Sequence, residues 1–216
     1  MDVIRASQFN RDFDLPDWRY ILGAIRATFD AGSFAGATAL ANEIGLAAEA
    51  ANHHPDIDIR YPALTRVKLI THASSGITQL DVDLAAIISE VAANAGATAS
   101  PAGASEAELA IDAMDIAAVK PFWMAAFGYI DVGDDVLEDP LRLGPSIWFQ
   151  QMDEQRDERN NIHIDVSVTH DVGDQRVAEV IAAGGRLVSD RRAPAFWILA
   201  DPEGNEACIC TWQARD

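Results

Sequence analysis

Three of the five histidines lie within twenty residues of one another, and their spacing could support proton transfer. His53 and His54 are adjacent and directly precede Pro55, and His72 follows later in the chain. An imidazole titrates near neutral pH, so it can give or take a proton during a reaction. Glu49, one helical turn before His53, is expected to orient that ring. This pattern predicts acid/base chemistry.

The segments before the histidines predict the elements that hold them. Small and apolar residues recur at three- and four-residue spacing from Phe34 to Ala51, which predicts a helix of about five turns ending before Pro55. Alternating apolar residues over 57–61 and 67–71 predict two strands, broken at Pro62. Two different elements thus deliver imidazoles from their ends, where scaffolds commonly hold catalytic side chains.

A second helix is predicted to start after Thr78-x-x-Asp81, which resembles a capping box, and to run from about 81 to 93. Asp81 is then either a plain helix cap or a support for one of the imidazoles. A turn at 15–18 and a strand region within 20–29 complete the segment. The prediction is an α+β unit in which two long helices pack on one face of an antiparallel sheet.

Two other interpretations of the histidines compete with catalysis. Adjacent histidines before a proline also occur at plain surface helix ends. A metal site is disfavoured here because His53 and His54 would rarely ligate one ion in good geometry, and neither cysteine is nearby in the sequence. We therefore expect no metal in this half of the chain.

Composition limits the class of protein. The chain has 216 residues, 49% of them hydrophobic, so one or two globular domains fit. A net charge of −18 disfavours both nucleic acid and anionic membranes as partners. Its apolar runs are far shorter than the roughly 20 residues that span a bilayer. Residues 1–5 show no apolar signal segment, and we expect a cytoplasmic protein.

A run of small residues over 94–105, with glycine and proline among them, predicts a linker. The charge balance changes there: residues 1–104 hold 7 basic and 12 acidic side chains, and residues 105–216 hold 9 and 22. We expect one domain over 1–94, a linker over 95–106 and a second domain over 107–216.

The second half predicts a weak internal duplication. Strands are expected at 109–113, 146–150, 161–168, 195–199 and 207–212. Helices are expected over 115–127 and 171–183, each ended by glycine, and the order strand, helix, several strands occurs twice. The two cysteines, Cys208 and Cys210, share one face of the last strand and are expected to be small core residues.

The first half closely resembles the pterin-4a-carbinolamine dehydratase family over residues 5–93. The resemblance rests on the pattern E-x-x-x-H-H-P from Glu49 to Pro55 and T-H-x-x-x-G-x-T-x-x-D from Thr71 to Asp81. It implies that a 4a-hydroxytetrahydropterin loses water to give a quinonoid dihydropterin, with no cofactor required. The implied catalytic residues are His53, His54 and His72 as the acid/base set, with Asp81 orienting or supporting an imidazole. The implied pterin-lining residues are Glu49, Pro55, Thr71, Ala73 and Ser74.

One position departs from that family. An acidic residue commonly follows the histidine of the second motif, and here the residue is Ala73. The departure puts rate and pterin preference in doubt. It also favours an alternative hypothesis, in which the domain is a catalytically silent pterin-binding or interaction module.

Residues 107–214 resemble the glyoxalase-like branch of the vicinal oxygen chelate superfamily. The segments that show this resemblance are D-I-A-A-V-K-P-F-W from Asp115, F-G-Y from Phe127, H-I-D-V from His163 and D-P-E-G-N from Asp201, with Gly184-Gly185 between the last two. The resemblance implies two βαβββ modules that form a half-open cup. It also offers Glu108, His163 and Cys208 as weak metal candidates.

That ligand set is not a recognised one, so we expect no metal in this domain; His163 could instead pair with Asp165. The leading hypothesis is a pterin dehydratase that forms a homodimer or homotetramer. A further hypothesis places the main activity in the second domain, as a glyoxalase-like lyase, isomerase or dioxygenase acting on an unknown small molecule.

Overall fold

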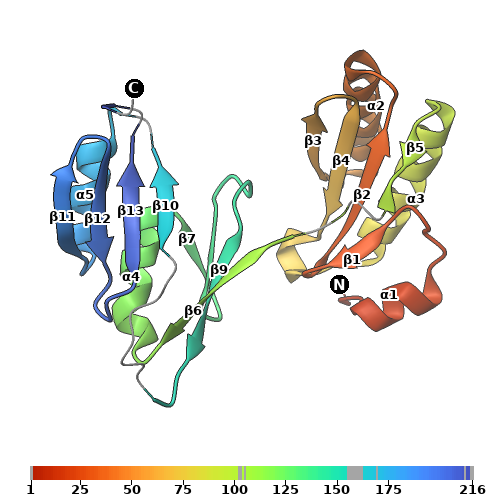
Figure 1. The fold of residues 1–216 in the computed structure, drawn as a ribbon. Coiled ribbons are helices and arrows are strands. Elements are labelled where there is room, and N and C mark those ends of the chain that lie inside the picture. Colours follow the sequence, from red (N-terminus) through yellow and green to blue (C-terminus); the bar gives the residue numbers. More distant parts are fainter. Residues whose placement is uncertain are drawn as a thin grey trace. The chain divides into compact units, whose positions relative to one another are not determined.

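The computed structural model describes residues 2–101, 104, 106–154, 163–168, 170–211 and 213–214. The chain divides into two compact units, Met1–Glu106 and Ala107–Asp216 (Figure 1). Each unit is described by itself. None of the helices in the described part of the chain is both long and apolar enough to cross a membrane.

The N-terminal unit is built on one antiparallel sheet in the order β1-β2-β4-β3, with β5 also paired to β2. The strands are β1 (Arg19–Ile21), β2 (Ala24–Asp30), β3 (Asp56–Arg60), β4 (Leu64–Leu69) and β5 (Thr98–Ala99). The helices are α1 (Ala6–Asp12), α2 (Phe34–Ala51) and α3 (Gln79–Asn94), with a 3-10 turn over His72–Ser74.

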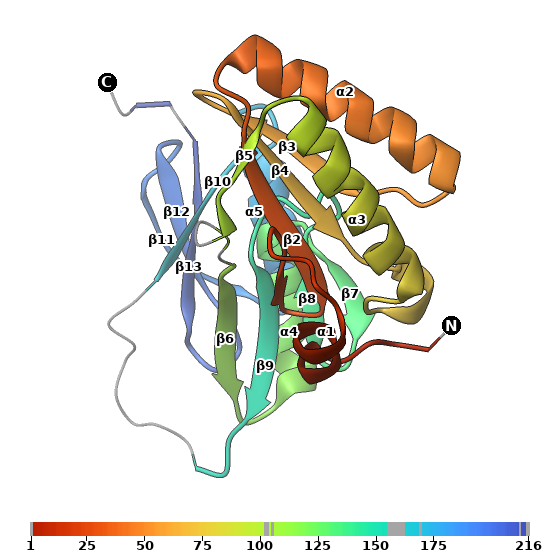
Figure 2. The same cartoon turned by 90° about the vertical axis from the view of Figure 1, so that its right-hand side faces the viewer.

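Helices α2 and α3 lie on the same side of this sheet (Figure 2). Both helices bury an apolar face: Leu40 and Ile44 from α2 and Leu84 and Ile88 from α3 are almost fully buried in one core. The α+β prediction for this unit is confirmed. The sequence shows the helix periodicity because, apart from Asp81, the buried residues of α2 and α3 are apolar and recur mostly at three- and four-residue spacing.

Part of the segment 95–106, which its composition predicted to be a linker, extends the sheet instead. Ala99 pairs with Phe29 in β2, and Ala97 packs against the core. Glu106 also forms an ion pair with Arg26 of β2, with 2.8 Å between Arg26 Nε and Glu106 Oε2. The small side chains of this segment do not predict the pairing, because neighbouring strands hydrogen-bond through their backbone groups and not through side chains.

The C-terminal unit consists of two modules of the type βαβββ, as the resemblance implied. The first contains β6 (Glu108–Ala113), α4 (Ile116–Phe127), β7 (Ile130–Gly133), β8 (Val136–Glu138) and β9 (Ser146–Gln151). The second contains β10 (Ile164–Ser167), α5 (Gly173–Ala182), β11 (Arg186–Arg192), β12 (Phe196–Ala200) and β13 (Glu206–Cys210). In each sheet the first strand pairs in parallel with the last, giving the orders β6-β9-β8-β7 and β10-β13-β12-β11.

Three details of this unit differ from the sequence predictions. The predicted strand over 161–168 is found over Ile164–Ser167, while residues 161, 162 and Trp212 lie outside the described residues. The predicted helix over 171–183 is shorter at both ends. Strands β7, β8 and β11 were not predicted, because nearly all side chains of β7 and β11 are exposed and β8 has only three residues.

Two side chains near one turn connect the modules of this unit. Trp123 of α4 donates its Nε1–H to Asp201 Oδ2, at 3.0 Å. Glu203 accepts hydrogen bonds from the backbone N–H groups of Met114 and Asp115, just before α4. The D-P-E-G-N segment therefore has a structural role, which is to fasten the end of the second module to the first.

Candidate functional site

His53 takes its position from the way α2 ends. Asn52, the C-cap, adopts the left-handed conformation with a φ of 48°, which ends the helix. The backbone N–H of His53 then donates to the carbonyl of Ala48, at 3.2 Å. The chain leaves the helix at a fixed angle, and the His53 ring is directed inward, with its side chain only 11% exposed.

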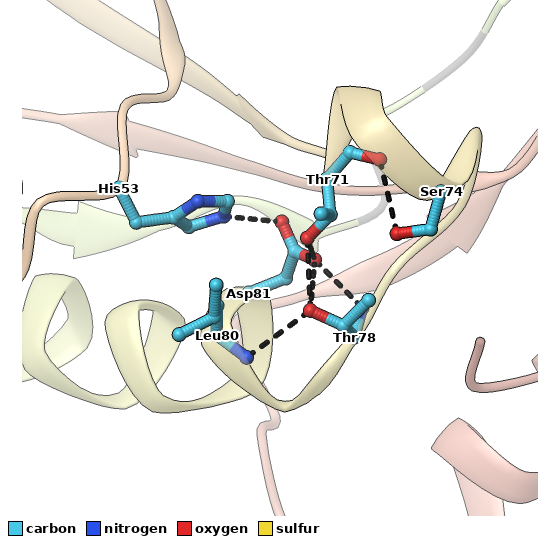
Figure 3. Close-up of polar contacts among 6 residues, drawn as sticks. All are labelled: His53, Thr71, Ser74, Thr78, Leu80 and Asp81. Carbon is cyan, nitrogen blue, oxygen red and sulfur yellow. Dashed lines mark hydrogen bonds and ion pairs between the residues drawn. The ribbon is translucent and has the colours of Figure 1, made fainter. Parts of the chain in front are cut away.

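The inward ring meets Asp81, which is fully buried in the first turn of α3. His53 Nε2 lies 2.7 Å from Asp81 Oδ1 (Figure 3). The other carboxylate oxygen, Oδ2, accepts the backbone N–H of Thr78 at 2.7 Å and completes a capping box. The two interpretations of Asp81, as helix cap and as support for an imidazole, are therefore both correct.

Thr71 adds a third partner to this carboxylate. It lies just after β4 and is held by a backbone bridge to Gly76, with Thr71 N–H donating to the Gly76 carbonyl at 3.1 Å. Its hydroxyl donates to Asp81 Oδ2 at 2.6 Å. Because that donation uses its only proton, the Thr78 hydroxyl, 2.8 Å from Thr71 Oγ1, is the donor of that pair.

These contacts determine which ring nitrogen of a neutral His53 carries the hydrogen. An ionised carboxylate only accepts hydrogen bonds, so His53 Nε2 carries the proton that it shares with Asp81. The neutral ring then has Nδ1 as its free acceptor. The Thr71 hydroxyl and the Thr78 N–H hold Asp81 Oδ2, and Oδ1 is directed at His53, so the ring orientation is set by a buried network rather than by solvent.

The other candidate residues lie around this pair. His54 is exposed, and its Nε2 lies 3.2 Å from Glu49 Oε1. Glu49 therefore pairs with His54, and the prediction that it orients His53 is wrong: His53 turns inward after the helix end, away from the exposed α2 surface. His72 follows Thr71 directly in the chain and is exposed.

The remaining predicted lining residues differ in exposure. Pro55 and Ser74 are half-buried and Ala73 is exposed. Ser74 closes the turn, because its backbone N–H donates to the Thr71 carbonyl at 3.0 Å. Thr71 is buried with its hydroxyl on Asp81, so its side chain supports the carboxylate.

A second cluster lies in the C-terminal unit. Strands β10 and β13, with the residue just before β10, bring together His163, Asp165 and Cys208, whose ligating atoms all lie within 4.8 Å of one another. Burial and a hydrogen bond to Asp165 raise the pKa of the Cys208 thiol to about 12. Glu108 is not part of this cluster; it accepts a hydrogen bond from Ser146 Oγ, at 3.1 Å.

Sequence reasoning missed two of these contributions. The sequence predicts Thr78 only as a helix cap. Its three-residue spacing from Asp81 is that of a capping box, in which the Thr78 backbone N–H donates to the Asp81 carboxylate. Asp165 was named only as a partner for His163. Its position two residues after His163 on a strand was a signal that both side chains share a face.

Comparison with known proteins agrees with this division of the chain. The family model described as pterin 4 alpha carbinolamine dehydratase matches residues 3–91, and the model described as glyoxalase-like domain matches residues 108–210. A relative from Nocardia farcinica is 48% identical over 79 residues, which cover 37% of this chain and 82% of the relative. A Roseiflexus relative is 46% identical over 78 residues, covering 36% and 83%. Both carry the provisional name pterin-4-alpha-carbinolamine dehydratase.

Solved structures match each half separately. A Brucella melitensis protein titled transcriptional coactivator/pterin dehydratase is 27% identical, covers 42% of this chain and 99% of its own, and has a TM-score of 0.38. A Burkholderia phytofirmans protein titled glyoxalase/bleomycin resistance protein/dioxygenase family enzyme is 19% identical, covers 50% and 98%, and has a TM-score of 0.41. On its identity to relatives whose length it largely covers, the chain belongs to the pterin-4a-carbinolamine dehydratase family through its N-terminal unit, and its residues 108–210 match the glyoxalase-like domain model.

Proposed function

We propose that the N-terminal unit dehydrates a 4a-hydroxytetrahydropterin to the quinonoid dihydropterin, with His53 as the general base. The observation that carries the proposal is the hydrogen bond between His53 and the fully buried Asp81. It presents His53 Nδ1 as an acceptor in a fixed orientation, which is what a base requires. The curated relatives named for this dehydration support the choice of substrate class.

The reaction balances without an oxidant or a cofactor. The base removes the proton from N5, and the electrons of that N–H bond form the N5–C4a double bond. The C4a–O bond breaks, and the leaving hydroxyl takes a proton from an acid and departs as water. His54 and His72 are the candidate acids, because both are exposed imidazoles next to residues of the His53–Asp81 site.

The test is stopped-flow absorbance on freshly generated 4a-hydroxytetrahydropterin, following quinonoid dihydropterin against a sample without protein. We expect the wild-type chain to accelerate dehydration and His53→Ala to lose about 100- to 10,000-fold of that acceleration, the usual contribution of a general base. His170→Ala, which changes an exposed histidine of the other unit, is the matched control and should behave as wild type.

Comparison of His54→Ala with His72→Ala identifies the acid, because only the acid variant should lose turnover while still binding pterin. A wild-type rate equal to that of the protein-free sample would reject catalysis on this pterin. Equilibrium binding of a stable tetrahydropterin then tests the alternative favoured by Ala73, a silent pterin-binding module. That module would bind the pterin and leave the rate unchanged.

A further inference from the structure

A short segment ahead of α1 packs against the part of the chain that carries His72. Residues 2–5, called the strap below, have no regular secondary structure. The backbone N–H of Ile4 donates to the Ile77 carbonyl at 2.8 Å, and both side chains are buried in the core of the N-terminal unit. Phe9 of α1 is buried in the same core, so the strap is attached to the core by Ile4 and by the helix that follows it.

The segment that the strap contacts is a small closed turn. Thr71 donates its backbone N–H to the Gly76 carbonyl at 3.1 Å, which closes residues 71–76 into the His72 turn. His72 is exposed and begins the 3-10 turn inside it. The chain then returns through Gly76 and Ile77 into the capping box of α3. The strap therefore contacts the returning limb of the turn that carries His72.

Val3 of the strap lies so close to Gly76 that no side chain fits between them. A Cβ added at Gly76 would lie 2.8 Å from Val3 Cγ1 and 3.6 Å from Val3 Cγ2. The φ of Gly76 lies outside the left-handed region, so its backbone conformation does not itself require glycine. The glycine is needed because the strap approaches the turn closely.

The two parts of the proposed catalytic site are held in different ways. The end of α2 and the buried bonds at the start of α3 hold His53 and Asp81. The backbone of His72 takes its position from the His72 turn, which the Thr71–Gly76 pair closes and the strap covers. A shift of the strap would therefore move His72 relative to the His53–Asp81 pair.

We propose that Val3 and Ile4 are positioning residues for the dehydration, which hold the His72 turn so that the His72 imidazole reaches the leaving hydroxyl as the general acid. This inference rests on the proposed function, and it selects His72 over His54 as the acid. A general acid must lie within hydrogen-bond reach of the group that it protonates. A misplacement of about 1 Å can lower a rate by about 100-fold.

The first test inserts a methyl group between the strap and the turn. Gly76→Ala keeps the carbonyl that accepts the Thr71 N–H, but its Cβ overlaps Val3 Cγ1, and a valine side chain has few rotamers with which to avoid it. We expect the stopped-flow dehydration rate at saturating pterin to fall by about 10- to 100-fold. Gly45→Ala is the matched control, because a Cβ at this position of α2 meets open space, and it should keep the wild-type rate.

Two double variants determine whether the loss arises at this contact and acts through His72. Val3→Ala combined with Gly76→Ala removes the overlapping methyl groups and should restore most of the rate. In a His72→Ala background, Gly76→Ala should cause no further loss, because the acid that it displaces is already absent. Partial unfolding, or damage to the His53–Asp81 pair, would instead multiply the two losses.

Hydrogen exchange followed by mass spectrometry tests the same contact without a pterin. Peptides that cover residues 71–78 should exchange faster in Gly76→Ala than in the wild type. Adding Val3→Ala should return the exchange toward the wild-type rate, and Gly45→Ala should not change it. Circular dichroism of each variant separates a displaced turn from a loss of folding.

A wild type that dehydrates the pterin no faster than Gly76→Ala would overturn the positioning role. A loss that Val3→Ala does not relieve, or one equally large in the His72→Ala background, would also overturn it, and so would unchanged hydrogen exchange in Gly76→Ala. A wild-type rate equal to that of the protein-free sample is a different result, because it would reject the proposed function and this role together.

Discussion

At the residue scale, Asp81 serves two purposes because each of its carboxylate oxygens has different partners. Oδ2 holds the start of α3 and the Thr71 hydroxyl, while Oδ1 orients His53. A buried carboxylate is costly unless it is fully hydrogen-bonded, and here the same bonds that satisfy it also build the site. Stability and the proposed catalysis are therefore coupled through one side chain.

Asp81→Asn is expected to lower the catalysed dehydration rate by about 100- to 10,000-fold. An asparagine that keeps its oxygen on the Thr78 N–H turns its NH₂ toward His53, so Nε2 must accept and the proton moves to Nδ1. The ring then has no acceptor for the pterin. Asp83→Asn, in the same helix but exposed and bonded to Gln79, should leave the stopped-flow rate unchanged. Equal rates for both variants would contradict the assigned tautomer.

The raised pKa of Cys208 predicts that the protein loses stability at alkaline pH. Burial raises its pKa from an ordinary 9.0 to about 12, so the folded state holds the thiol proton more tightly than the unfolded chain does. That stabilisation is complete below about pH 9 and is lost as the pH rises toward about 12. Urea unfolding across this pH range should show a flatter alkaline decline in the free energy of unfolding for Cys208→Ala than for the wild type; parallel curves would contradict the raised pKa.

At the scale of elements, the ends of the helices decide where the histidines lie. Helix α2 starts at a Ser33 cap, whose hydroxyl accepts the Gly36 N–H at 3.0 Å, and ends at the left-handed Asn52. The length of α2 between these caps sets the position from which His53 turns inward. Helix α3 starts at the capping box that contains Asp81 itself.

Ser33→Ala should lower the free energy of unfolding by about 0.5–2 kcal/mol, because it removes an N-cap acceptor. The site lies at the other end of α2, so the stopped-flow dehydration rate of the folded variant should match that of the wild type. Ser33→Asp keeps an acceptor and serves as the control in urea denaturation. A stability loss as large in Ser33→Asp as in Ser33→Ala would show that the cap is not the cause.

At the scale of the whole molecule, the chain contains two cores that share no residue. One core joins α2 and α3 to the N-terminal sheet, and the other joins α4 and α5 to the two sheets of the C-terminal unit. A unit with its own core can unfold as its own cooperative transition. The proposed pterin chemistry accordingly belongs to the first unit alone.

Phe122→Ala should destabilise the second unit by about 3–5 kcal/mol, since the ring is fully buried and packs edge-on against Trp123. Differential scanning calorimetry should show one transition moving down and the other unchanged, with dehydration retained while the first unit is folded. Phe29→Ala, in the core of the first unit, should move the other transition. Both transitions shifting together in either variant would contradict independent cores.

The α+β class, most helices and strands, and the motif residues from Glu49 to Asp81 could be predicted from the sequence alone. These features are local: apolar periodicity, caps and turn residues act within a few positions of each other. Strand β5 was not predicted because its two small residues pair only through the backbone, and strands β7, β8 and β11 were not predicted because they are short or have mostly exposed side chains.

Which side chains meet depends on tertiary packing. Asp81 contacts His53, Glu49 contacts His54, and Asp165 rather than Glu108 lies beside Cys208. Each of these pairings depends on the angle at which a chain leaves a helix or on the register between two strands. Such angles and registers are set by packing across the whole unit, so no local stretch of sequence encodes them.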